Sequence, residues 1–166
     1  MEPLARVKAV SAARKPFSLN VTWNNGGKST VDLTGLVYRS RHFRVFIDDA
    51  AAFRKVRVVN FGSGIGWENG LDYAAETLQL LADEQSPMSG DFLVNFQTRH
   101  NLNTAETANL LRIAERTLRA YRSATELPTP IALSLRRMDG DPTVFAAHYR
   151  PIERRKRGRP KSQASV

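Results

Sequence analysis

The stretch TAETANLLRIAERTLRAYRSA, residues 104–124, contains two short amphipathic segments with no Gly, Pro or long polar loop between them. Apolar residues recur at helical spacing on both sides of a break at Arg112–Ala114. A solvated surface helix has no need of such a break, so the spacing indicates that the angle between the two helices is itself useful. The apolar positions are Ala105, Ala108 and Leu111 in the first segment, and Ile113, Leu118 and Tyr121 in the second.

The helical period continues on both sides of this stretch. The apolar residues of Phe92–Phe96 predict a helix that ends near residue 100, and Asn103 is suited to cap the next one. Pro128 or Pro130 can begin a fourth helix, and Asp141–Pro142 supplies an N-cap with a first-position proline for a fifth. We therefore predict an all-α domain of four to five short helices over residues 86–149.

A family resemblance rests on the central pair of helices. The run Leu102-Asn-Thr-Ala-Glu106-Thr-Ala108, followed by Ile113, Thr117-Leu118 and Tyr121, resembles the λ-repressor-like helix-turn-helix pattern. Two helices that cross steeply need a small side chain at the closest approach, Ala108, and an apolar plug in the turn, Ile113. The resemblance implies that the helix at 115–123 lies in a DNA major groove while the preceding helix crosses the backbone.

Two positions depart from the family pattern. Arg112 stands where the family often has Gly, so its backbone must be left-handed or otherwise strained if the usual turn is kept. Ala114 stands at the usual Ser or Thr N-cap and offers no side-chain cap. A helical bundle that is purely structural, or that contacts protein, is the alternative interpretation.

The resemblance also implies a set of DNA-contacting residues. Glu115, Arg116 and Arg119 would face base edges, because Arg pairs with guanine and Glu can accept from cytosine. At the start of the preceding helix, Thr104 would contact a phosphate, aided by free backbone N–H groups. Arg112 and Arg122 are expected to contact phosphates. The alternative for each arginine is an ordinary solvated helix face.

The N-terminal half has a different periodicity. Alternating apolar residues over 16–23, a turn at Asn24–Gly27 and renewed alternation at Val31 and Leu33 predict a β-hairpin. Two further apolar runs, Phe43–Ile47 and Val56–Phe61, flank a segment that can make one helical turn. We expect a helix from an N-cap at Asp72 to about Asp83, after several strands. This half is therefore predicted to be a small α+β domain.

This half resembles a family as well. Val31-Asp32-Leu33, Phe43, Phe53, Val56 and above all Trp67-Glu-Asn-Gly70-Leu-Asp72 look like a bacterial family of small domains of unknown function, some of which are fused to a repressor-like helix-turn-helix. No activity comes with the resemblance. The predicted fold class is thus an α+β domain at 1–85, made of antiparallel strands plus one helix, then the all-α λ-repressor-like domain at 86–149, with a linker around Gln85–Gly90 and a tail at 150–166.

Charge is concentrated in the second half of the chain. The net charge is +9, of which +2 falls on residues 1–85 and +7 on residues 86–166. Seven of the basic residues lie within 150–161, so we expect a polyanion partner, nucleic acid before an anionic membrane surface. The segment Arg157-Gly158-Arg159-Pro160 resembles the core of the AT-hook, which lies in A·T-rich minor grooves. A disordered cationic tail that binds any polyanion is the alternative.

Signs of catalysis are weak. The three histidines, His42, His100 and His148, are far apart and lack partners at metal-ligand spacing, and the chain has no cysteine. The glycines between 62 and 70 fit neither phosphate-loop nor dinucleotide patterns and favour a hairpin turn. We therefore expect no enzyme activity, no metal and no cofactor. No apolar run reaches the roughly 20 residues of a membrane span, so we expect a cytoplasmic protein with no membrane contact.

The sequence as a whole predicts a sequence-specific protein that binds double-stranded DNA, either a transcriptional regulator or an antitoxin-like repressor. We expect a homodimer, because paired half-sites raise specificity. The N-terminal domain would dimerise or bind a protein or small-molecule partner. The alternative function is a protein-interaction adaptor with non-specific nucleic-acid affinity.

Overall fold

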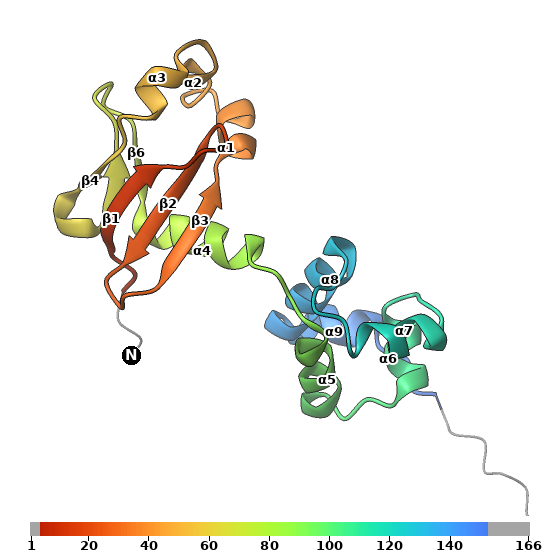
Figure 1. Ribbon diagram of the computed structural model, residues 1–166. Helices are drawn as coiled ribbons and strands as arrows, with labels where there is room; N and C mark the ends of the chain where they lie inside the picture. Colours follow the sequence, from red (N-terminus) through yellow and green to blue (C-terminus); the bar gives the residue numbers. More distant parts are fainter. Residues whose placement is uncertain (1–3, 153–166) are drawn as a thin grey trace, which may run out of the picture. The chain divides into compact units, whose positions relative to one another are not determined.

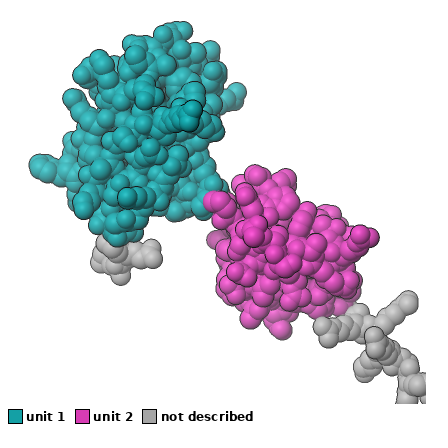
Figure 2. All heavy atoms as spheres, in the orientation of Figure 1, with its two compact units in different colours: residues 1–86 teal, residues 87–166 magenta. Residues whose placement is uncertain are grey.

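Figure 1 shows the computed structural model of the chain, which describes residues 4–152. The chain divides into two compact units, unit 1 (residues 1–86) and unit 2 (residues 87–166), which Figure 2 draws in different colours. The boundary falls between Ser86 and Pro87. Each unit has its own hydrophobic core.

Unit 1 opens with an antiparallel sheet of β1 (Val7–Ala12), β2 (Ser18–Trp23) and β3 (Lys28–Asp32), in that order. Leu19, Val21 and Trp23 are all buried, and the pairing of β2 with β3 confirms the predicted hairpin. Its turn is closed by the backbone N–H of Trp23, which donates to the carbonyl of Gly27 at 2.8 Å. β1 was not predicted from the sequence.

The second sheet of unit 1 is also antiparallel and contains β4 (Arg57–Val59), β5 (Gly64–Gly66) and β6 (Asp72–Ala74). A Cβ atom at Gly64 would lie 2.9 Å from the carbonyl oxygen of Tyr73, so glycine allows the close approach of the strands. The segment predicted as a hairpin turn therefore contains a strand as well. The turn itself is closed by Trp67 N donating to Leu71 O at 2.9 Å.

The helices of unit 1 are α1 (Thr34–Arg39), α2 (Val45–Asp48), α3 (Ala50–Phe53) and α4 (Ala75–Gln85), with a 3₁₀ turn, η1, at Asn60–Gly62. α4 packs on β3, and the side-chain amide of Gln85 exchanges two 2.8 Å hydrogen bonds with the backbone of Asp32. This amide pairs backbone groups on the edge of the first sheet, which would otherwise be open.

Aromatic side chains dominate the core of unit 1. The ring of Trp67 lies 5.7 Å from Phe43, 5.1 Å from Phe46 and 5.7 Å from Phe53, measured between centroids. The indole N–H of Trp67 donates to the backbone carbonyl of Phe53 at 2.8 Å, so burial leaves this donor satisfied. Trp67 thus joins the segment after β5 to α2 and α3.

Unit 2 is helical over its described residues, with α5 (Gly90–Arg99), α6 (Thr104–Leu110), α7 (Glu115–Tyr121), α8 (Thr129–Gly140) and α9 (Pro142–His148). Leu93, Phe96, Leu118 and Leu135 are fully buried at its centre. Two predicted helix starts are confirmed. Asn103 forms a capping box with Glu106 at the start of α6, and the carboxylate of Asp141 caps α9.

The predicted fold class is wrong. The predicted α+β class of unit 1 fits its described residues, but two three-stranded sheets are interspersed with four α-helices, where strands followed by one helix were expected. Asp72, the predicted N-cap, lies in β6, and part of the run Phe43–Ile47 forms α2. The helices of unit 2 do not clearly form the all-α λ-repressor-like helix-turn-helix domain that the sequence predicted, so that assignment is withdrawn.

Candidate nucleic-acid interface

The outward face of α7 is cationic. Leu118 is fully buried and fixes the opposite face of the helix in the core of unit 2. Glu115, Arg116 and Arg119, the three residues expected to face base edges, are all exposed. Arg122, directly after the helix, is exposed as well. The arrangement therefore presents three guanidinium groups and one carboxylate to solvent.

The arginines of this face differ in their partners. Arg119 donates to the Glu115 carboxylate at 2.8 Å, one helical turn away. Within residues 4–152, Arg116 and Arg122 form no ion pair. A base or phosphate must therefore compete with Glu115 for Arg119, whereas Arg116 is available without such competition. The i,i+4 pair was not anticipated, although the Glu-x-x-x-Arg spacing is its signal.

The turn between α6 and α7 has the strained backbone that the sequence predicted. Arg112 has φ of 56°, in the left-handed region, and its N–H donates to Asn109 O at 3.1 Å. Ile113 donates to Ala108 O at 3.0 Å and packs against the core as the expected plug. Ala114 makes no side-chain cap to α7, also as predicted. This turn fixes the direction in which α7 leaves α6.

Gly90 fixes the other end of α7. Its N–H donates to Ala124 O at 2.8 Å, and a Cβ atom built on it would lie 2.6 Å from the carbonyl oxygen of Arg122. Only glycine lets the first turn of α5 approach the backbone that follows α7 this closely. α7 is therefore held at both ends with its arginines outward.

Two of the predicted phosphate contacts come together and the third does not. Thr104 and Arg122 both line a polar hollow of about 300 Å³ between α5 and α6. Arg112 instead lines a separate groove with Leu133 and Met138. The remaining residues of the polar hollow are Val94, Gln97, Thr98, Asn101, Leu102 and Asn103.

A buried polar network lies beneath this hollow. Gln97 is 8% exposed and donates to the hydroxyl of Thr107 at 2.9 Å, and Thr107 donates in turn to Asn103 O at 2.8 Å. Because that hydroxyl has a single proton, the orientation of the Gln97 amide is fixed. Its Oε1 atom is buried and has no partner among the described residues. The network joins α5 to α6 at the floor of the hollow.

The carboxylate of Glu106 joins several segments of unit 2, a role that was not predicted from the sequence. Its carboxylate accepts from Asn103 N at 2.9 Å, from the hydroxyl of Tyr149 at 2.8 Å and from Ile152 N at 3.4 Å. The carboxylate occupies the start of α6, so fewer backbone N–H groups are free there for a phosphate than predicted for Thr104. The hydrogen bond to Glu106 also raises the pKa of Tyr149, because it stabilises the protonated phenol.

Other predictions fall outside this face. Arg157, Gly158, Arg159 and Pro160, the AT-hook-like residues, lie outside the described residues. Between residues 4 and 152, no group of three or more His, Cys, Asp or Glu side chains could hold a metal ion. Over the same residues, every helix is too short or too polar to cross a bilayer.

Comparisons with known proteins add one similar structure. No protein-family profile and no curated protein sequence matches the chain. A crystal structure of a candidate DNA-binding protein from Nitrosomonas europaea, NE0471, aligns with 82% of this chain and 87% of that one, at 23% sequence identity and a TM-score of 0.46.

Proposed function

We propose that this protein binds double-stranded DNA in a sequence-specific way through unit 2, as a transcriptional regulator or an antitoxin-like repressor. The observation that carries the proposal is the outward face of α7, where Arg116, Arg119 and Arg122 are exposed around a single carboxylate. A rigid helix that presents arginines to solvent suits a major groove, because the fork of a guanidinium matches O6 and N7 of guanine.

Arg116 is the primary base-reading residue in this proposal. It is exposed and has no ion-pair partner among the described residues, so its guanidinium is free for a guanine edge. Arg119 contacts a base only after its ion pair with Glu115 has broken, so it discriminates less strongly between base pairs. Once released, Glu115 can accept from the amino group of cytosine.

Thr104 and Arg122 hold the DNA backbone. They line the same polar hollow, so a hydroxyl and a guanidinium face one site of a size that suits a phosphate. Phosphate contacts fix the register of the protein on the duplex, and base contacts on α7 then specify the sequence. The basic tail adds affinity: if about six of its charges met phosphates, the log-log salt slope would steepen by about five.

The decisive experiment selects bound duplexes from a random pool and then compares two charge-matched variants. Arg116→Ala with Arg119→Ala should abolish preference for the selected sequence and leave weak, salt-sensitive binding. The control, Arg41→Ala with Arg57→Ala, removes two exposed arginines of unit 1 and should keep the preference. Failure of the pool to converge on any sequence would contradict the proposal and favour the adaptor.

The selected sequence also tests the expected homodimer. A dimer should select a palindrome whose half-sites lie about 34 Å apart or at a multiple of that distance. A single non-repeated site would show that the protein reads DNA as a monomer.

The backbone contacts have a separate test. Arg122→Ala should weaken binding to all sequences alike and reduce the salt slope by about one. Arg112→Ala serves as the comparison, because Arg112 is also predicted to contact phosphate but lines a different groove. Equal losses would assign both arginines to the DNA backbone, and loss from Arg122 alone would leave Arg112 outside the interface.

A further inference from the structure

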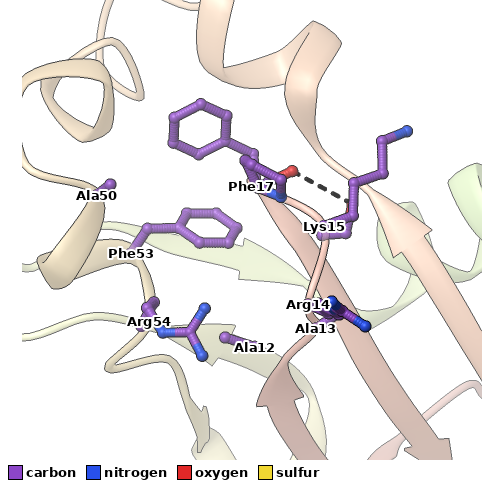
Figure 3. Close-up of a pocket in the computed structure, with 10 residues that line it drawn as sticks. Ala12, Ala13, Arg14, Lys15, Phe17, Ala50, Phe53 and Arg54 are labelled. Carbon is purple, nitrogen blue, oxygen red and sulfur yellow. Dashed lines mark hydrogen bonds between the residues drawn. The ribbon is translucent and has the colours of Figure 1, made fainter.

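A small cavity lies in unit 1, at the connection between β1 and β2. It is partly open to solvent and has a volume of about 140 Å³, close to the ~150 Å³ of an engineered protein cavity that binds benzene. Figure 3 shows the residues that line it, which come from the end of β1, the β1–β2 loop, the start of β2, and α3. They are Ala12, Ala13, Arg14, Lys15, Pro16, Phe17, Ser18, Ala50, Phe53 and Arg54.

The walls of the cavity are apolar and partly aromatic. Phe53 is 2% exposed, and its ring meets that of Phe17 edge to face at 5.5 Å between centroids. Ala12 and Ala13 supply small side chains opposite α3 and leave the space unfilled. A flat apolar group of the size of one ring therefore fits between these residues.

The backbone of Phe17 is strained. Its φ is 52°, which is rare for a bulky residue, and its carbonyl accepts from Leu33 N at 2.8 Å. The hydrogen bond and the contacts with Phe53 and Tyr38 hold Phe17 in this conformation. Such strain persists where surrounding contacts over-determine a residue, and it is concentrated at ligand-binding positions.

The rim of the cavity is positive. Arg14 and Arg54 are exposed and form no ion pair within residues 4–152, whereas Lys15 is paired with Asp32. In Figure 3 the side chain of Arg54 runs toward Ala12 beside the Phe53 ring. None of the lining residues is acidic. The cavity thus combines an apolar interior with a guanidinium at its edge.

We propose that this cavity binds a small aromatic monocarboxylate, with its ring packed against the touching rings of Phe53 and Phe17 on the side of Ala12, and its carboxylate paired with Arg54. The ring of the ligand contacts the apolar walls, and the guanidinium group of Arg54 binds its carboxylate through two parallel hydrogen bonds. All residues that line the site belong to unit 1, so its assignment does not rest on the function proposed for unit 2.

Benzoate is the probe, added to the full-length protein and followed by two-dimensional amide NMR. We expect saturable shifts at Ala12, Phe17 and Phe53, with a Kd on the order of 1 mM for so small a ligand. Benzamide, which has the same shape without the charge, should bind at least about tenfold more weakly, because it cannot form the two charge-assisted hydrogen bonds to Arg54.

Variants distinguish binding of benzoate in the pocket from general electrostatic attraction to a basic surface. Arg54→Gln should weaken benzoate binding about tenfold or more, while Arg57→Gln, an exposed arginine on β4, should leave it unchanged. Ala12→Leu fills the cavity and should abolish the shifts while the rest of the spectrum keeps its native dispersion. Non-saturable shifts, equal binding of benzamide, or unchanged binding to Arg54→Gln would each overturn the proposal.

Discussion

The two units bury different kinds of side chain. Three of the four buried polar or charged residues in the described range lie in unit 2, namely Gln97, Glu106 and Thr107. Gln97 and Thr107 join α5 to α6, and Glu106 binds the hydroxyl of Tyr149 after α9. Unit 1 buries only Ser18 of this kind and packs its sheets and helices around Trp67 and three phenylalanines. Apolar and aromatic packing dominates the core of unit 1, whereas a buried side-chain hydrogen bond joins α5 to α6 in unit 2.

The difference in buried side chains between the two units matches the sites proposed for them. Buried hydrogen bonds add little net stability but allow one arrangement only, because a shifted partner leaves a buried polar group unsatisfied. Unit 2 uses them directly beneath the hollow of Thr104 and Arg122, the site proposed above for a DNA backbone, which would need a fixed register. The small cavity of unit 1 is instead shaped by apolar packing and by the strained backbone of Phe17.

The largest effect is expected from the aromatic core. Phe46→Ala removes a fully buried ring that contacts both Phe53 and Trp67, and should lower the free energy of unfolding of unit 1 by about 3–5 kcal/mol. Both tryptophans, Trp23 and Trp67, lie in unit 1, so their fluorescence follows that unit alone. Far-UV circular dichroism should retain a helical transition from unit 2.

Val45→Ala, at a half-exposed position beside Phe46, is the control and should change stability by less than about 0.5 kcal/mol. If Phe46→Ala moved both transitions together, the two units would not be independent in stability.

The corresponding change in unit 2 is Leu118→Ala. This fully buried side chain anchors α7, and its loss should lower the stability of unit 2 by about 2–5 kcal/mol and leave the tryptophan transition in place. Leu133→Ala, at a leucine that is 52% exposed on α8, should have little effect. A shift in tryptophan fluorescence with Leu118→Ala would contradict the separation of the two cores.

The difference between the two units also explains which of their structural features could be predicted from the sequence. Helix starts in unit 2 depend on residues adjacent in the chain: Asn103 caps α6, and Asp141 with Pro142 starts α9, because cap chemistry is local. The left-handed backbone of Arg112 agrees with the expectation from the family resemblance, in which a position often held by Gly is left-handed or otherwise strained. Local signals of this kind give the positions of the helices, but not their packing, and the fold class assigned from them was wrong.

Unit 1 depends on contacts that the sequence does not display. The residues of β1 alternate weakly and become a strand only by pairing with β2. Asp72 has the chemistry of an N-cap, but pairing with Gly66 draws it into β6. Short apolar runs such as Phe43–Ile47 fit a strand or a buried helix equally well, and tertiary packing decides between them.

The candidate interface also has features that could be predicted from the sequence and features that could not. The exposure of Glu115, Arg116 and Arg119 follows from the helical period around Leu118 and was predictable. Glu106 is separated from Tyr149 and Ile152 by more than forty positions in the chain, so no local pattern in the sequence predicts these contacts.

Those contacts give unit 2 a specific pH dependence. The Glu106 carboxylate raises the pKa of Tyr149 above its ordinary 10.0, so the protonated phenol stabilises the folded state. The contribution is complete below pH 10.0 and is lost as the pH rises through the higher folded value. The melting temperature of unit 2 should therefore fall above this pH more steeply in the wild type than in Tyr149→Phe.

At neutral pH, Tyr149→Phe should lower that melting temperature by a few degrees, because Glu106 loses one hydrogen-bond donor. The tryptophan transition of unit 1 is the internal reference. Parallel pH curves for the wild type and the variant would show that this hydrogen bond does not form in solution.

The smallest effect is a gain of stability at the start of α7. Ala114 has the extended backbone of an N-cap, with φ of −71° and ψ of 147°, but no side-chain oxygen. Ala114→Ser should supply the missing acceptor and stabilise unit 2 by about 0.5–1 kcal/mol. Ala120→Ser, the same substitution within the exposed face of α7, should instead destabilise slightly, because Ser is a poorer helix former than Ala. Opposite signs for the two variants in chemical denaturation would locate the gain at the cap, and equal signs would show that Ala114 does not occupy the N-cap position of α7.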